Sequence, residues 1–455
     1  MAAEGLRTPD AETVRQHVAS ALRRYWPSNP ERVSALPIER RGAVDVRGPL
    51  ALVDVPLPPY AHGVGVDGRL LVPREACAAP ASIADWRGVD WWLAAFLLLE
   101  GWHERAWERA HGPVHSYAYR LRSWDERAWD RAWVNRIALW LRAWAAHDAG
   151  AGQGQLLGPL PTPRLEMTHD VDAVSKTHAI RIKQSAFLAF NAGRSAWRRR
   201  WPDAARGLGR TARFLTGHED WWMLDRLCGV ERDAGIRSTF HFYAGSGRGG
   251  PLAWLFDPGY DIATPRIARF VRALGDDGWR VGLHQSHAAW REPSAMQPQR
   301  ERLESIVGRP VTACRQHWLR FSWDDTWSAQ HAAGLRRDAT LMFNDRPGLR
   351  SAAALEWQPW NARAGESHGL HVLPTVLMDS HLYDYVPFAA DERRAAMHRW
   401  LEEIASVGGE AAVLWHPHTL TRDYGWSDGF RELLAEMESL MRAHGGLVAG
   451  SRDAS

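Results

Sequence analysis

Residues 164–172 of this chain read Arg164-Leu165-Glu166-Met167-Thr168-His169-Asp170-Val171-Asp172. The first four of these residues have the short, apolar character of a buried strand, and the strand runs directly into a group of polar residues. Further along the chain, other short apolar runs alternate with amphipathic segments. Because such alternation of strands and helices is typical of parallel sheets and barrels, we expect an α/β fold.

The predicted elements downstream of this strand follow one repeating pattern. The strands are predicted at 164–167, 238–243, 280–283, 311–314, 371–373 and 412–415. The amphipathic segments between them, predicted as helices, are 264–278, 296–306, 324–334 and 391–406.

The part of the chain before this strand has a different texture. Residues 8–25 predict a surface helix that begins near Thr8 or Asp10, and short β-like pieces follow at 51–55 and 69–72. Two helices come next, and Trp129, Trp133, Trp140 and Trp144 lie on one stripe of the second. We interpret this stripe as core or interdomain packing; a sugar-binding platform is the alternative.

A segment rich in glycine and proline between 150 and 163 is the clearest linker. It predicts two domains, a smaller α+β domain over 1–155 and a barrel-like α/β domain over 156–455. The whole chain has 455 residues, a length that suits two or three domains.

Composition and charge exclude several functional classes. The 45% apolar and 24% charged residues are typical of a globular protein, and a net charge of only +3 gives no reason to expect nucleic-acid binding. Three distant cysteines form no disulfide framework. The longest apolar run, 91–99, is far shorter than the ~18 residues of a membrane span, and the N-terminus lacks a signal-peptide core. We therefore expect a soluble, cytoplasmic protein; the sequence indicates no oligomeric state.

Polar residues follow five predicted strands at their carboxyl ends, where parallel α/β folds gather functional groups. These groups are 168–172, 284–287, 315–317, Asp379 and 416–418. One carboxylate and two imidazoles with an open position form a familiar catalytic metal site. In an Asp-x-Asp pair, one carboxylate can bind the metal while the other accepts a proton. Each group taken alone could instead be a turn, a cap or a satisfied polar residue.

In this order of motifs, residues 164–420 resemble the polysaccharide deacetylase (NodB-homology) superfamily, carbohydrate esterase family four. The resemblance is carried by Asp170-x-Asp172, by Gly282-Leu283-His284-Gln285-Ser286-His287, by Arg315, by Leu414-Trp415-His416, and by 238–242 and 338–340. It implies a distorted (β/α) barrel that removes acetyl groups from N-acetylated sugars. A bacterial subgroup of the family carries an N-terminal domain of unknown role, which residues 30–145 resemble more loosely.

The resemblance also implies roles for individual residues. Asp170 is expected to be the catalytic base, Arg315 to orient it, and His416 to be the general acid. Asp172, His284 and His287 are expected to bind one divalent metal ion, in the first place zinc, with cobalt, manganese or iron as alternatives.

Two departures from the family pattern leave alternatives open. The histidine pair has spacing i, i+3 instead of i, i+4, so His317 or His169 could replace His287 as the third ligand. Arg315 is followed by Gln316-His317-Trp318, which indicates a different substrate groove. We predict substrate contacts at His317, Trp318 and Asp379; Asp379 could also position an imidazole.

The expected function is metal-dependent removal of an N-acyl group from an amino sugar, in surface-polysaccharide or glycan-precursor metabolism. The alternatives are a catalytically silent barrel that binds a glycan or a protein partner, and a metal hydrolase of another C–N amide bond. The shortened histidine spacing favours the former alternative.

A basic insertion around 185–220 interleaves arginines with Trp197 and Trp201. The simplest interpretation is a solvated helix with tryptophan packed beneath it. The alternatives are binding of an anionic glycan, of a lipid- or nucleotide-linked sugar, or of a membrane surface, with nucleic acid the weakest.

Overall fold

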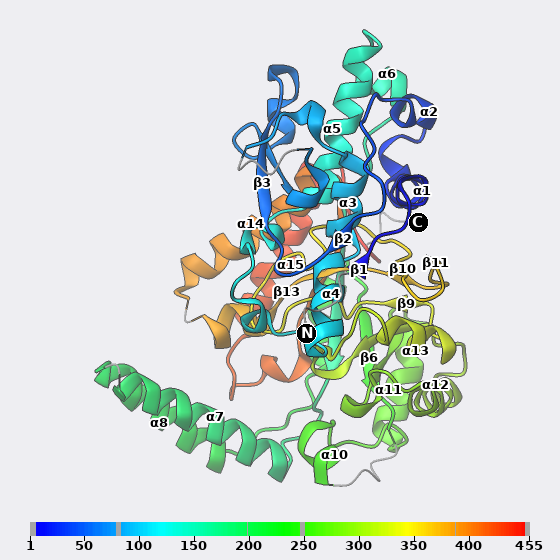
Figure 1. The fold of residues 1–455 in the computed structure, drawn as a ribbon. Coiled ribbons are helices and arrows are strands. Elements are labelled where there is room, and N and C mark those ends of the chain that lie inside the picture. Colours follow the sequence, from blue (N-terminus) through cyan, green and yellow to red (C-terminus); the bar gives the residue numbers. More distant parts are fainter. Residues whose placement is uncertain (1–5, 79–82, 198, 246–250, 387, 451–455) are drawn as a thin grey trace.

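The barrel is built on a long, curved parallel sheet, which confirms the α/β prediction. The computed structural model describes residues 6–78, 83–197, 199–245, 251–386 and 388–450 (Figure 1). The sheet order is β12-β9-β8-β7-β6-β5-β14-β13, every pairing is parallel, and β15 also pairs with β5. These strands are β5 (Arg164–Val171), β6 (Thr239–Tyr243), β7 (Arg280–Gln285), β8 (Ala313–Gln316), β9 (Arg337–Asp338), β12 (His371–Val372), β13 (Thr375–Met378), β14 (Glu410–Leu414) and β15 (Leu447–Val448).

The sheet curls until its two edges almost meet. Strands β12 and β13 lie at opposite edges, yet only Leu373 and Pro374 separate them in the chain. Because this one extended segment pairs with β9 at its start and with β14 at its end, the strands enclose an interior. The barrel-like architecture is therefore confirmed.

The alternation of side chains along β5 explains why this strand lies at the centre. Leu165, Met167 and Val171 point outward into the apolar core, while Thr168 and Asp170 belong to the polar interior. The helices around the barrel are α9 (Leu224–Asp233), α10 (Pro251–Phe256), α11 (Pro265–Asp276), α12 (Pro293–Val307), α13 (Thr326–Ala332), α14 (Ala390–Ser406) and α15 (Ser427–Ala443). A short π-helix covers His381–Tyr385.

The N-terminal region mixes helices with small antiparallel sheets. Its helices are α1 (Ala11–Ala21), α2 (Pro30–Ser34), α3 (Trp91–Leu99), α4 (Trp102–His111), α5 (Trp133–Asp148) and α6 (Gln153–Leu157). Its strands are β1 (Leu6–Arg7), which pairs with β2 (Asp45–Val46), and β3 (Leu52–Pro56), which pairs with β4 (Arg69–Pro73). Asp10 caps α1 by accepting hydrogen bonds from the backbone N–H groups of Glu12 and Thr13.

The four tryptophans are packing residues, as expected, but Trp129 lies in a 3-10 turn before α5 and not on the same helix as the other three. Trp129, Trp133, Trp140 and Trp144 are all buried, and they belong to one apolar cluster that also contains residues between 321 and 372. The small strands β10 (Trp360–Asn361) and β11 (Glu366–Ser367) lie within this stretch of the chain. The N-terminal region thus packs closely on the barrel, and the boundary near 155 stays a prediction.

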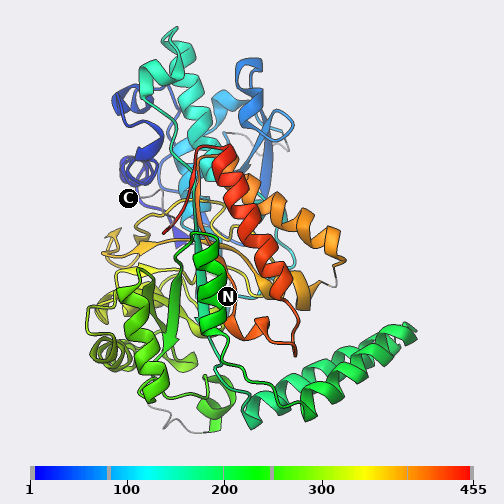
Figure 2. The same cartoon turned by 180° about the vertical axis from the view of Figure 1, so that it is seen from behind.

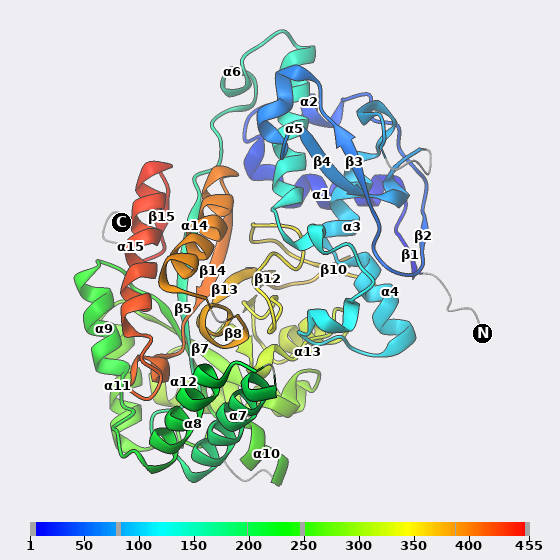
Figure 3. The same ribbon diagram turned by 90° about the vertical axis from the view of Figure 1, so that its left-hand side faces the viewer.

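Helices α7 (His178–Trp197) and α8 (Trp201–Thr216) form an antiparallel pair, which we call the arm. Figures 1 and 2 show the arm extending away from the barrel, at the end opposite the N-terminal region (Figure 3). Trp197 is 83% exposed and Trp201 is 66% exposed, so the expectation that tryptophan packs beneath this helix is wrong for both. Among the described residues, none of the helices has the length and apolar character needed to cross a membrane.

Candidate metal-dependent active site

Three side chains from different strand ends converge inside the mouth of the barrel. The Nε2 atom of His284, at the end of β7, lies 3.1 Å from Oδ1 of Asp172, which follows β5. The Nε2 atom of His317, which follows β8, lies 3.6 Å from the same oxygen. The ligand atoms of all three lie within 4.8 Å of one another, close enough to bind one ion.

Unsatisfied buried atoms indicate that this cluster fits a metal ion. Within the described residues, His284 Nε2 and Asp172 Oδ1 are buried and make no hydrogen bond. The other ring nitrogen of His284, Nδ1, donates to the carbonyl oxygen of Arg315 at 2.9 Å, so the lone pair of Nε2 faces Asp172. Two imidazoles and one carboxylate form the ligand set of a catalytic zinc site, in which a fourth position stays open.

Asp257 supports His317 from the side away from Asp172. Its Oδ1 atom lies 3.6 Å from His317 Nδ1 and accepts the backbone N–H of His287 at 2.6 Å. Burial opposes the charged carboxylate, but His317 and this backbone bond hold the pKa of Asp257 below its usual value. Sequence analysis missed Asp257, because it follows a short helix and belongs to no strand-end motif.

The two other candidates for the third ligand lie elsewhere. His287 begins a short 3-10 turn just after β7, where its ring stacks on Phe256 and its Nδ1 lies 3.3 Å from Arg320. His169 points outward from β5, and both of its ring nitrogens are occupied, by the carbonyl oxygen of Trp415 and by Glu231. His317 therefore takes the place in the cluster that the resemblance assigns to His287.

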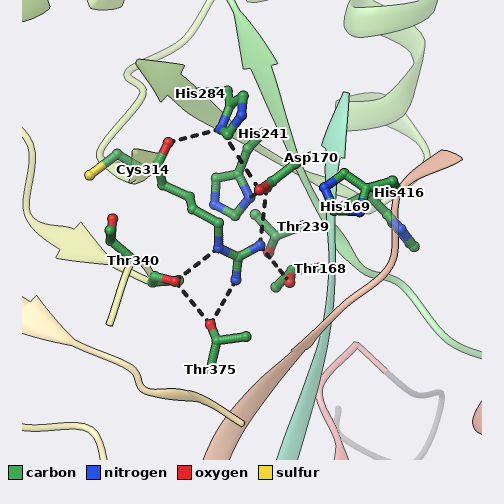
Figure 4. A network of polar contacts seen from close by, with 12 residues as sticks. Thr168, His169, Asp170, Thr239, His241, His284, Cys314, Thr340, Thr375 and His416 are labelled. Carbon is green, nitrogen blue, oxygen red and sulfur yellow. Dashed lines mark hydrogen bonds and ion pairs between the residues drawn. The ribbon is translucent and has the colours of Figure 1, made fainter. Parts of the chain in front are cut away.

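Asp170, labelled in Figure 4, lies in the barrel interior and is held by Arg315. The Arg315 guanidinium donates to Asp170 Oδ1 at 3.1 Å and to the hydroxyls of Thr168 and Thr375. Burial opposes ionisation of Asp170, but Arg315, with smaller contributions from His284 and His241, holds its pKa well below the usual range. The carboxylate is thus kept charged.

His416 and Asp379, which follow the neighbouring strands β14 and β13, form a second pair. His416 Nδ1 lies 2.8 Å from Asp379 Oδ1, and Asp379 also accepts the backbone N–H of His416. Burial alone would favour the neutral imidazole, yet Asp379, together with Asp172 and Asp170, raises the pKa of His416 to about 10. Of the two roles expected for Asp379, its contacts match the positioning of an imidazole.

His241 is a residue of the interior that sequence analysis did not single out. It lies on β6, and its Nδ1 is 3.4 Å from Asp170 Oδ1. A Cβ atom at Gly282 on the neighbouring strand would come within 2.6 Å of the His241 ring, so glycine makes room for it. Burial lowers the pKa of His241 to about 4, which keeps the ring neutral beside the charged pair.

A pocket of about 850 Å³ opens over these groups. Trp318, predicted to contact substrate, lies in its wall together with Tyr385 and Phe187. The base of α7 also contributes Lys183, whose ammonium group donates to the carbonyl oxygen of Leu255. The walls therefore combine flat aromatic faces with charged groups.

No protein-family model matches this chain, and no curated protein matches it. Solved structures similar to it include polysaccharide deacetylases. A protein from Mycobacterium smegmatis assigned as such an enzyme has 17% sequence identity and a TM-score of 0.38, over 64% of this chain and 93% of that one. The chitin deacetylase from Colletotrichum lindemuthianum has 14% identity and a TM-score of 0.32, over 64% and 88%. An allantoinase has 12% identity and a TM-score of 0.37, over 62% and 89%.

Proposed function

We propose that this protein is a metal-dependent amide hydrolase that removes an N-acyl group from an amino sugar of a surface polysaccharide or glycan precursor. One observation carries the proposal: a ligand set with unsatisfied buried atoms lies between a carboxylate kept charged by Arg315 and an imidazole kept charged by Asp379. Groups with the chemistry of a base, of metal ligands and of an acid thus line one pocket, which supports amide hydrolysis.

Asp172, His284 and His317 would hold one divalent ion, which when bound lowers the pKa of a water molecule and polarises an acyl oxygen. Asp170 accepts the proton of the attacking water, and Arg315 aims the carboxylate by a charge-assisted hydrogen bond. His416 donates a proton to the departing amine. Asp379 fixes the ring through Nδ1, so that Nε2 faces Asp172 at 3.6 Å.

The walls of the pocket support a sugar as the part of the substrate that bears the acyl group. Trp318, Tyr385 and Phe187 provide flat aromatic surfaces on which a sugar ring can stack. Asp384, also in the wall, has its pKa raised to about 7 by burial and by the neighbouring Asp379, so it can donate a hydrogen bond to a hydroxyl near neutral pH.

The test is metal content, measured by mass spectrometry on the wild type and on three single variants. We expect about one divalent ion per chain in the wild type, its loss in Asp172→Ala and His317→Ala, and its retention in His287→Ala, the matched control outside the cluster. Loss in His287→Ala with retention in His317→Ala would contradict the ligand set. Acetate release from a panel of N-acetylated sugars then tests the substrate class. A metal-loaded protein that cleaves only cyclic or small amides would redirect the proposal to another C–N bond.

A further inference from the structure

One side of α8 is an exposed apolar stripe along its whole length. Trp201, Ala205, Leu208, Ala212 and Leu215 are all exposed and are spaced alternately by four and three residues. This spacing places them on a single helix face. The opposite flank carries Arg206, Arg210 and Arg213.

Helix α7 has a similar stripe. Ile182, Ala186, Phe190, Gly193 and Trp197 are exposed and are separated by four, four, three and four residues, which also keeps them on one helix face. The side of α7 that packs on α8 carries the buried Ser185 and Ala192 instead.

The two stripes lie on the same side of the arm. In each helix, the stripe is rotated by roughly 100° from the side that packs on the partner helix, at 100° per residue. The rotation has the same sense in both helices. Because the helices are antiparallel, it brings both stripes to one common surface, which we call the apolar face.

The arm is also strongly cationic. Over residues 176–216 the sequence has a single acidic residue, Asp203. The basic residues over the same range are Lys176, Arg181, Lys183, Arg194, Arg198, Arg199, Arg200, Arg206, Arg210 and Arg213. The helix pair is about 10 Å thick per helix, so the basic residues within α7 and α8 lie within about one Debye length of anything that touches the apolar face; these are Arg181, Lys183, Arg194, Arg206, Arg210 and Arg213.

We propose that the arm docks on an anionic membrane surface by laying its apolar face into the lipid headgroup region. An amphipathic helix with tryptophan and leucine on one side and arginines around it binds in the plane of such an interface. The stripe runs from the base of the arm to its tip, which favours a flat orientation over insertion of the tip alone. Trp197 and Trp201 at the tip suit the interfacial depth at which tryptophan collects.

Charge favours lipid over a second copy of this chain. Two arms that met through their apolar faces would bring two strongly positive segments together, which repel each other. Anionic headgroups instead complement the charge. The base of the arm lines the pocket through Ile180, Lys183 and Phe187, so docking also brings the pocket close to the lipid. A lipid-linked amino sugar is then the favoured substrate, a consequence that rests on the proposed function.

Vesicle flotation tests the docking separately from catalysis. The vesicles are phosphatidylcholine with 30% phosphatidylglycerol, and phosphatidylcholine alone. The test variant is Trp201→Ser with Leu208→Ser, whose side chains are 66% and 58% exposed; the matched control is Tyr119→Ser with Leu160→Ser, at 50% and 55%. All four side chains are exposed, so circular dichroism and thermal unfolding should match the wild type.

We expect the wild type and the control to float with anionic vesicles, less so at high salt, and the stripe variant to lose at least about tenfold in partitioning. Three outcomes would overturn the proposal: no flotation of the wild type, equal flotation of the stripe variant, or a wild-type dimer in light scattering that the stripe substitutions dissociate. None of these depends on metal content or hydrolysis, so failure of docking and failure of the proposed function are distinguishable.

Discussion

Two buried clusters of charged side chains in this protein differ in how completely their polar atoms are satisfied. In the N-terminal region, the Glu100 carboxylate accepts hydrogen bonds from His17, Arg105, Trp357 and the backbone of Trp360. Arg105 in turn donates to three backbone carbonyl oxygens and to Asp324. Every charge in this Glu100 cluster has partners within the protein.

The cluster at the candidate active site also has buried polar atoms, but it leaves some of them without partners. His284 Nε2 and Asp172 Oδ1 make no hydrogen bond within the described residues. Such atoms are costly when buried, and the folded protein tolerates them where a ligand completes the set. We call the Glu100 cluster the closed cluster, because its charges are satisfied within the protein, and the cluster at the candidate active site the open cluster. The closed cluster maintains the fold, whereas the convergent ligand atoms of the open cluster indicate binding.

Replacing Asp170 by asparagine gives the largest expected effect in the open cluster. The amide cannot accept a proton, so kcat on an N-acyl sugar should fall by about 10²–10⁴-fold. Metal content should stay at the wild-type value, because Asp170 is outside the ligand set. Steady-state kinetics with metal analysis on the same sample checks this. An unchanged kcat would remove Asp170 from the mechanism.

Breaking the closed cluster should cost stability and leave the site intact. Glu100→Gln keeps the volume but leaves the Arg105 charge buried with Asp324 as its remaining carboxylate. The free energy of unfolding should fall by about 3–5 kcal/mol, the usual cost of breaking a buried ion pair. Urea denaturation measures it, and the metal content per folded chain should not change. If metal binding is lost together with stability, the two clusters are not independent.

The sequence predicted which residues gather at the candidate site better than it predicted which of their side chains contact one another. Strand-end placement was enough to bring Asp170, Asp172, His284, Arg315 and His416 into one barrel mouth. The geometry of these ends follows from parallel pairing, which a local pattern of apolar runs can reveal.

The third ligand could not be chosen in this way, because it depends on turns. His287 and His317 both follow a strand within three residues, and only the backbone after each strand decides where the ring points. After β8, Trp318 and Leu319 adopt left-handed conformations (φ 56° and 49°), and this turn leaves the His317 ring facing Asp172. Asp257 and His241 were missed for a related reason, since their contacts join different segments of the chain: Asp257 meets His317, and His241 on β6 meets Asp170 on the neighbouring strand β5.

Glu108, a buried carboxylate near the closed cluster, gives the prediction with the smallest expected effect. Glu104 pairs with Arg350, whereas Glu108 accepts hydrogen bonds from Val114, Ser322 and Trp323. Burial and the nearby Glu104 raise the pKa of Glu108 to about 8. The Glu108 carboxylate thus loses its charge by protonation near neutral pH, whereas the carboxylates of the open cluster stay ionised.

The sign of the pH dependence follows from this shift. Above the ordinary value of 4.5, the unfolded chain has lost the proton that folded Glu108 keeps until about pH 8. Folding binds a proton in this window, so the free energy of unfolding should fall as pH rises, by at most about 1.4 kcal/mol per pH unit. Glu108→Gln cannot ionise and should flatten the slope, measured by urea denaturation at pH 5, 6, 7 and 8. Equal slopes in both proteins would mean that Glu108 is already ionised in the folded protein, and that backbone and hydroxyl donors alone sustain this buried charge.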